Sequence, residues 1–175
     1  PVTCWYMKPG GVSNRGPEAK LAALPVAQKR RDIMPLAVYT AGVVEGEALE
    51  AAADRGNAAP QDGHPNAGWS GGKQLWWTGG KPGDTLRLSF GIAEPGRYAL
   101  TLTLTHASDY GIADIGLNGA TLVKDYDAYA TKVETHVVDL GAVDLKDGEN
   151  VLTFKITGEN PKAKRDSYMM GVDKL

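Results

Sequence analysis

The sequence predicts an all-β fold, an antiparallel β-sandwich that follows an irregular N-terminal arm. Short segments in which apolar and polar residues alternate recur from Ala41 to Leu175, and this period of two is typical of strands with one buried face. Turns rich in Gly, Asp and Asn separate the segments, and no long amphipathic helix pattern interrupts them. With 175 residues, the chain has the length for one core and an arm, and little length is left for a second full-sized domain.

Residues 1–40 form the predicted arm. Its first segment, Val2–Lys8, has strand composition, but nothing nearby in the sequence offers it a partner. Residues 18–31 can form a turn or two of helix, which Pro25 interrupts. We therefore assign residues 1–40 to an arm or linker and residues 41–175 to the sandwich.

Two consecutive segments give the clearest strands. Leu86, Leu88 and Phe90 share one face of the first, and Gly91–Gly96 supplies the turn to the second, residues 97–106. In the second segment Tyr98 and three leucines face inward, and threonines form a β-branched outer face that suits an antiparallel sheet.

The later part of the chain continues this pattern. Ala113, Ile115 and Leu117 alternate up to Asn118-Gly119, a dipeptide that predicts a tight hairpin because both central residues of a type I′ turn need positive φ. The remaining expected elements are the return strand 121–124, a Tyr-bearing polar loop 125–132, and strands 133–140, 151–156 and 168–175, with an earlier strand at 73–77.

Acidic residues mark both ends of the predicted sandwich. In Val43-Val44-Glu45-Gly46-Glu47, read as a strand, Glu45 and Glu47 project to one side, and Asp173 of the last strand could meet them where the first and last strands pair. Three converging carboxylates suit a hard cation, most plausibly calcium, and without one they would repel each other and raise their own pKa values. The alternative is a set of surface carboxylates on edge strands. We favour a structural calcium held by Glu45, Glu47 and Asp173.

This acidic pattern, together with Pro95-Gly96-Arg97-Tyr98 and Gly148–Phe154, resembles the galactose-binding-like jelly roll of carbohydrate-binding module families 6 and 35. In those families a Glu-x-Glu first strand and an Asp in the last strand hold a structural calcium. The resemblance covers roughly residues 41–175. It implies a non-catalytic module that binds a polysaccharide or oligosaccharide.

Loop aromatics are the best candidates for sugar contact, because an aromatic face covers the apolar face of a pyranose while nearby amides and acids bind its hydroxyls. Trp76 and Trp77 are adjacent and must point to opposite faces of a strand, so at most one belongs to the core; core packing with a domain interface explains this pair as well as a binding platform does. Trp69 lies in a Gly/Pro/Asn/Ser loop and is the stronger candidate. The full candidate set is Trp69, Trp76, Trp77, Asp109, Tyr110, Asn118, Tyr126, Tyr129 and Asn160.

Several other function classes are disfavoured. The net charge of −2 and a pI near 5.9 argue against a nucleic-acid partner, and no segment approaches the ~20 apolar residues of a membrane span. Gly68-Trp69-Ser70-Gly71-Gly72 matches a serine nucleophile motif but lacks its strand-to-helix context. The three histidines lack zinc-site spacing, and the single Cys4 excludes an internal disulfide.

The arm carries a second resemblance. Trp5-Tyr6 and Leu24-Pro25 with Arg30-Arg31 are similar to the closing strand and exit segment of glycoside hydrolase family 172. This implies a C-terminal accessory domain whose catalytic partner lies upstream of Pro1, in a secreted or periplasmic protein, although the chain itself has no signal-peptide pattern. The alternative function is an architectural sandwich that packs on a parent enzyme or mediates oligomerisation without binding sugar. A weaker third reading is an enzyme in its own right.

Overall fold

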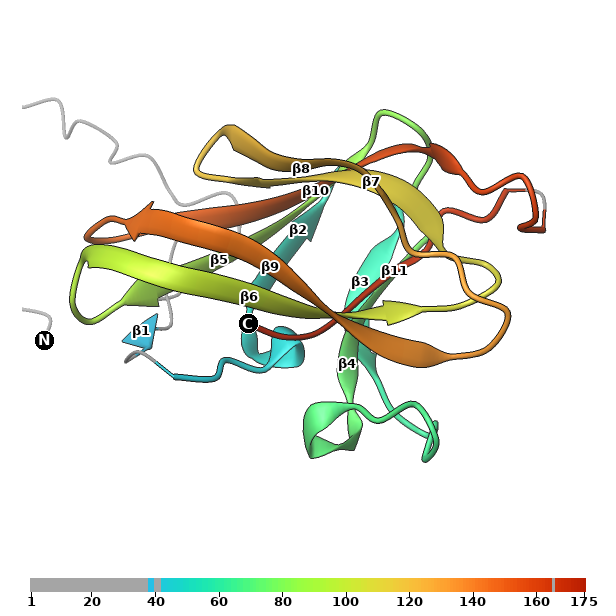
Figure 1. Cartoon of the computed structure of the whole chain (residues 1–175), viewed down its shortest axis with the longest axis horizontal. Coiled ribbons are helices and arrows are strands. Elements are labelled where there is room, and N and C mark those ends of the chain that lie inside the picture. Colours follow the sequence, from blue (N-terminus) through green and yellow to red (C-terminus); the bar gives the residue numbers. More distant parts are fainter. Residues whose placement is uncertain (1–37, 40–41, 165) are drawn as a thin grey trace, which may run out of the picture. The chain divides into compact units, whose positions relative to one another are not determined.

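The computed structural model describes residues 38–39, 42–164 and 166–175, and these residues form two β-sheets. Sheet I has the order β1-β5-β10-β7-β8, with β2 also paired to β5, and sheet II has the order β3-β4-β11-β6-β9 (Figure 1). The strands of sheet I are β1 (Val38–Tyr39), β2 (Glu50–Ala53), β5 (Thr85–Ile92), β7 (Gly111–Leu117), β8 (Ala120–Asp127) and β10 (Asn150–Glu159). Those of sheet II are β3 (Asn57–Gln61), β4 (Gln74–Thr78), β6 (Gly96–His106), β9 (Glu134–Leu145) and β11 (Met170–Lys174).

The core lies between the inner faces of the two sheets, which the predicted alternation identified. Leu86, Leu88 and Phe154 of sheet I are completely or almost completely buried, as are Leu102 and Leu104 of sheet II. Every described strand pair except β1–β5 is antiparallel. The predicted all-β, antiparallel sandwich is therefore confirmed.

Two strands, one in each sheet, were not predicted. β2 is mostly alanine and β3 contains Asn57 and Pro60, so neither has the β-branched or aromatic composition that marks a strand. Each is hydrogen-bonded along its length to a neighbour with strong strand composition, β5 for β2 and β4 for β3. Tertiary pairing thus outweighs their weak local propensity.

Three predicted boundaries need correction. β8 continues through Tyr126 to Asp127, so the expected loop from residue 125 begins later. β9 runs past residue 140 to Leu145, with a register shift opposite Leu100 and Thr101 that accommodates Gly141 at φ 74°. Residues 43–47 are not a strand: Glu45 makes a single bridge to Lys174, and the 3-10 turn η2 (Gly46–Ala48) follows.

The predicted arm lies mostly outside the described residues. Its described part, β1, pairs in parallel with Gly91 and Ile92 of β5, so sheet I begins before the predicted boundary at residue 41. The C-terminal end of the chain lies beside the segment that precedes η2, where Val44 and Leu175 exchange two backbone hydrogen bonds (Figure 1). The two ends of the sandwich are therefore paired, as the acidic pattern predicted.

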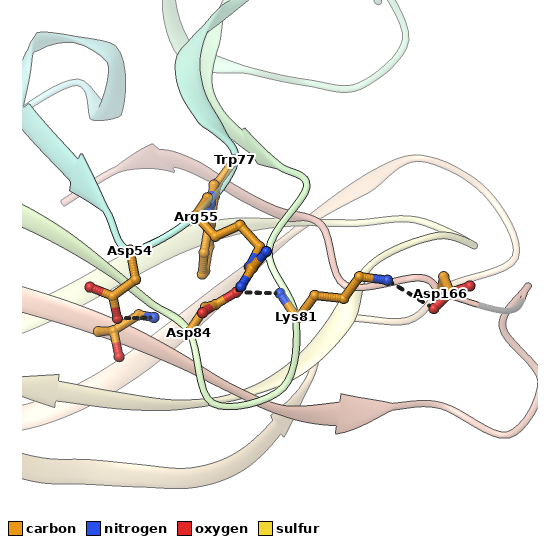
Figure 2. Close-up of polar contacts among 7 residues, drawn as sticks. Asp54, Arg55, Trp77, Lys81, Asp84 and Asp166 are labelled. Carbon is orange, nitrogen blue, oxygen red and sulfur yellow. Dashed lines mark hydrogen bonds and ion pairs between the residues drawn. The ribbon is translucent and has the colours of Figure 1, made fainter.

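Polar contacts close the turns at the end of β4. Asp84 accepts from the Arg55 side chain at 3.1 Å and from the Lys81 backbone N–H at 2.9 Å, while the Lys81 ammonium pairs with Asp166 (Figure 2). The Trp77 indole N–H donates to the Arg55 carbonyl oxygen at 2.8 Å. These bonds fix the β2–β3 and β4–β5 turns and satisfy the one polar atom of the Trp77 side chain.

Candidate functional site

The candidate site lies on the outer face of sheet II, where strand alternation places Gln74 and Trp76 of β4. Leu75 and Trp77 point into the core on the other side of the same strand. In register, Trp76 lies between Ala59 of β3 and Gly171 of β11, so two small residues leave space for its indole ring. The β3–β4 loop, with the 3-10 turn η3 (Ser70–Gly72), extends from β4 at the bottom of the view (Figure 1).

A chain of buried hydrogen bonds runs beneath this loop. The Trp69 indole N–H donates to Thr105 Oγ1 at 2.8 Å, and that hydroxyl donates to Gln74 Oε1 at 2.5 Å. The Gln74 amide nitrogen donates to Tyr110 OH at 3.0 Å and to Gln61 Oε1 at 2.6 Å. Gln74 and Thr105 have no exposed surface, and buried polar groups of this kind are stable only when they are paired.

Three hollows lie along the β3–β4 loop, and His64 lines all of them. The smallest of the three, about 90 Å³, will be called the Trp76 hollow. The largest of the three, about 610 Å³, will be called the trough, and its walls are residues 64–67 and 132–135. Residues lining the Trp76 hollow are Gln61, His64, Trp69, Trp76, Ala107, Asp109, Tyr110 and Val133.

One residue that lines the Trp76 hollow has an unused hydrogen-bond donor. Trp76 Nε1 is buried and has no hydrogen-bond partner among the described residues. Across the hollow, burial is the main reason that the pKa of Tyr110 is raised well above its ordinary value, and the negative charge of Asp109 raises this pKa further. Trp76, with its unpaired N–H, and the Asp109 carboxylate therefore belong to the lining of the same hollow.

Four of the nine predicted sugar contacts come together here: Trp69, Trp76, Asp109 and Tyr110. Three others are Tyr126, Tyr129 and Asn160, which lie at the end of β8 and in two segments that hydrogen-bond to Asp127. The backbone N–H of Tyr129 and the side-chain amide of Asn160 donate to Asp127, which ends β8 one residue after Tyr126. None of these three lines one of the three hollows.

Two predicted contacts lie elsewhere. Trp77 has no exposed surface and packs in the core, so it is not available to a ligand. Asn118 lies in the β7–β8 turn, at the opposite end of β7 from Asp109 and Tyr110. Its side chain donates to Asn150 and accepts from the Val151 N–H, so it stabilises that turn.

Trp69 is also less accessible than its loop composition suggested. Its side chain is 8% exposed, and the ring of His64 packs edge-on against it at 5.4 Å between ring centroids. The hydrogen bond from its indole N–H to Thr105 of β6 holds the ring against sheet II. Trp69 is thus a wall of the hollows and not an exposed platform.

A histidine pair that the sequence did not single out lies at the neighbouring end of the sandwich. The rings of His106 and His136 stack with centroids 4.1 Å apart, and His106 Nε2 lies 2.6 Å from Tyr126 OH. Burial, and then the charge of His136, lower the pKa of His106, while burial raises the pKa of Tyr126 to about 12. Both groups are therefore neutral near pH 7.

The predicted metal-binding carboxylates occupy one neighbourhood at the paired chain ends. Ser70 joins two of them: its hydroxyl donates to Glu45 Oε1 at 2.8 Å and its backbone N–H donates to Asp173 Oδ1 at 2.7 Å. Burial raises the pKa of Asp173, and the charges of Glu45 and Glu47 raise it further against the opposing effects of Ser70 and Lys174. The negative charges are close enough to repel one another.

The donor set of this carboxylate cluster fits a hard cation in one respect and not in another. Glu45 Oε2 and Glu47 Oε2 are buried and have no hydrogen-bond partner among the described residues, and carboxylate oxygens are the ligands that calcium prefers. The carboxylates do not, however, form a ready ligand shell, because no group of three or more His, Cys, Asp or Glu residues in the described part of the chain is arranged to hold a metal ion.

Comparisons with known proteins show the fold and not the family. No protein-family model matches the chain, and no curated protein matches it either. Among solved structures, a Paenibacillus xanthan lyase matches with a TM-score of 0.65 and 23% identity over 77% of this chain and 13% of the lyase. At that identity the likeness supports a shared sandwich fold, and the chain spans only a small part of the lyase.

Two weaker matches have TM-scores below 0.5. A Podospora anserina GH26-CBM35 β-(1,4)-mannanase matches with a TM-score of 0.46 and 19% identity over 76% of this chain and 26% of the mannanase. A CBM35 from Paenibacillus barcinonensis matches with a TM-score of 0.45 and 14% identity over 76% of this chain and 94% of that module. Within the described residues, no helix has the length and apolar character to cross a membrane.

Proposed function

We propose that this chain is a non-catalytic carbohydrate-binding module that serves as an accessory domain of a glycan-degrading enzyme. The observation that carries the proposal is the aromatic and polar lining of the hollows on sheet II. Indole and phenol rings offer apolar faces to a sugar, and Trp76 Nε1 and Asp109 offer a free donor and an acceptor for its hydroxyl groups.

The direct test is retention of the full chain on immobilised polysaccharides, with an inert protein of similar size as the control. Specific retention, competed by the matching soluble oligosaccharide, is the expected result and names the sugar class. If the folded protein elutes with the control from every matrix, the proposal fails.

The second candidate function is an architectural sandwich that packs on a parent enzyme or mediates oligomerisation. The burial of Trp69 favours it, because a side chain that is 8% exposed and hydrogen-bonded to Thr105 contributes to stability whether or not a sugar binds. Trp69→Ala should therefore lower the free energy of unfolding by about 3–5 kcal/mol. Failure of the wild-type chain to bind any glycan, together with this stability loss, would favour the architectural function.

We further propose that Glu45, Glu47 and Asp173 hold a structural calcium ion. Support comes from the two unpaired carboxylate oxygens and from the raised pKa of Asp173. A cation would compensate the repulsion among these groups and tie η2 to β11, provided that the carboxylates draw together around it. Its role would be stabilisation and not chemistry.

Thermal unfolding with and without a chelator tests the calcium proposal. A ligand that binds only the native state stabilises it by about 2.7 kcal/mol at 100 times its dissociation constant, so chelation should lower Tm and added calcium should restore it. Asp173→Asn should abolish the calcium response, whereas Asp125→Asn on β8 should leave it unchanged. Equal Tm values for the wild-type chain in chelator and in calcium would refute the metal site.

The proposed cellular context follows from the same function. A module that binds polysaccharide acts where polysaccharide is found, so we place the parent protein outside the cytoplasm, secreted or periplasmic. The relation of residues 1–40 to glycoside hydrolase family 172 concerns residues that lie mostly outside the described part of the chain, and it stays a prediction.

A further inference from the structure

The polar groups around the Trp76 hollow divide into paired and free ones. Gln61 and Tyr110 both interact with the Gln74 amide, and the Trp69 N–H is used by Thr105. Trp76 Nε1 has no partner, and the Asp109 carboxylate makes no hydrogen bond within the described residues. A ligand that reaches both groups would meet one N–H donor and one carboxylate acceptor.

These two free groups select the chemistry of the ligand. A hydroxyl group can accept from the indole N–H through its oxygen, and a second hydroxyl can donate to the carboxylate. A ligand carboxylate could accept from Trp76, but it would have no proton to offer Asp109 and would be repelled by its charge. The hollow is therefore suited to the hydroxyl groups of a sugar and not to the carboxylate of an acidic sugar.

The sizes of the neighbouring hollows limit how such a ligand can enter. The Trp76 hollow, at about 90 Å³, is far smaller than the ~300–1,000 Å³ of a typical small-molecule site, so it holds part of one sugar. The trough, at about 610 Å³, falls within that range and shares His64 and Val133 with the hollow. A small hollow beside a larger trough fits the end of a chain better than its middle.

We propose that the Trp76 hollow receives part of the terminal, uncharged sugar of a glycan, with the Trp76 indole N–H donating to a sugar oxygen and Asp109 accepting from a sugar hydroxyl. The following sugars lie along the trough, between residues 64–67 and residues 132–135. This inference rests on the proposed carbohydrate-binding function and specifies its ligand as a neutral chain end.

Isothermal titration of the full chain with neutral and acidic probes tests the proposal. The neutral probes are cellohexaose, mannohexaose and a β-1,3-galactan oligosaccharide, and the acidic probe is trigalacturonate. At least one neutral probe should bind and trigalacturonate should not. The reducing end of the probe that binds is then reduced with borohydride, and loss of binding would show that this end enters the hollow. A long polymer of the same sugar should bind about one protein per chain. Binding of many proteins along each polymer chain would overturn recognition of the end.

Two conservative variants separate this inference from the general function. Trp76→Phe keeps an aromatic ring but removes the N–H. It should raise Kd about 3- to 10-fold, which corresponds to the loss of one hydrogen bond. Asp109→Asn keeps the shape and removes the charge, so it should weaken neutral binding and reduce discrimination against trigalacturonate. Asp125→Asn, on the opposite sheet, is the matched control and should match the wild type.

The outcomes distinguish the two levels of the proposal. If a neutral probe binds and both variants retain wild-type Kd values with unchanged Tm, the hollow is not the sugar site, and this inference fails while the carbohydrate-binding function stands. If no probe binds the wild-type chain, both fail together.

Discussion

The two faces of sheet II are built from the same strands but stabilised in different ways. On the inner face, Trp77, Leu104 and Val172 pack against sheet I and have no exposed surface. On the outer face, Gln74 and Thr105 are equally buried, yet they are covered by the β3–β4 loop and held by hydrogen bonds. Adjacent residues of β4 thus enter two environments, one apolar and one polar.

The difference follows from what covers each face. A facing sheet presents apolar side chains and keeps its backbone groups paired within its own ladder, so dispersion and water exclusion suffice. A loop has few ladder bonds of its own, and the strands beneath it must supply polar partners. The Gln74 side chain shows the result, because beneath the loop it hydrogen-bonds to Thr105, Tyr110 and Gln61.

Among substitutions within the strands of sheet II, the largest expected effect comes from the inner face. Trp77→Ala removes a fully buried indole and leaves a cavity between the sheets, so the free energy of unfolding should fall by about 3–5 kcal/mol. Val137→Ala, which truncates a side chain that is 71% exposed on β9, is the control and should change stability by less than about 0.5 kcal/mol. Denaturant unfolding measures both, and similar values for the two variants would show that the inner face is not the main core.

The outer face should respond through unpaired polar groups. Gln74→Ala removes the hydrogen-bond partners of Thr105, Tyr110 and Gln61 at once, and each buried group left unsatisfied costs about 1–3 kcal/mol unless water replaces the amide. We expect a total loss near 2 kcal/mol, because water can enter from the Trp76 hollow. Thr101→Ala, an exposed position on the same face of β6, is the control.

If the Gln74→Ala variant were as stable as the wild type, the outer face would be an open surface and not a second buried layer. A Gln74→Glu variant sharpens the test, because it keeps the size of the side chain but replaces its donor with a charge. It should be at least as destabilising as the alanine variant.

The inner face could be predicted from the sequence because it depends on local alternation. Leu86, Leu88 and Phe90, and then Leu100, Leu102 and Leu104, repeat with a period of two and are buried as expected. β2 and β3 could not be predicted in this way, since Ala51, Ala52 and Pro60 become part of a sheet only through the strands beside them.

The candidate site was predictable only in part. Composition identified Trp69, Trp76, Asp109 and Tyr110, which do line one hollow, but not that the loop buries Trp69. Gln74 and His64 were missed because a buried glutamine and a loop histidine carry no periodic signal. Their roles arise from contacts across 13 to 36 residues of sequence, such as Gln74 with Gln61 and with Tyr110.

The smallest expected effect is a pH dependence at the edge of the inner face. Burial, and then the charge of His136, lower the pKa of His106 from its unfolded value of about 6.5. The unfolded chain therefore binds this proton more readily, so the stability contributed by neutral His106 is complete above about pH 6.5 and is lost as pH falls toward the lower folded pKa. Tyr126 and His136 face this ring, and Glu134 and Asp127 partly oppose the shift.

Denaturant unfolding between pH 7.5 and pH 5 measures this dependence. His106→Gln removes the titrating group, so its stability should fall less steeply with acidification than that of the wild type. His136→Asn should have an intermediate slope, because it removes the like charge and leaves the burial of His106 in place. A His106→Gln slope equal to that of the wild type would assign the acid sensitivity to other groups. The stability of the inner face would then come from apolar packing even at the end where His106 lies, and the inner and outer faces would differ more than the structure implies.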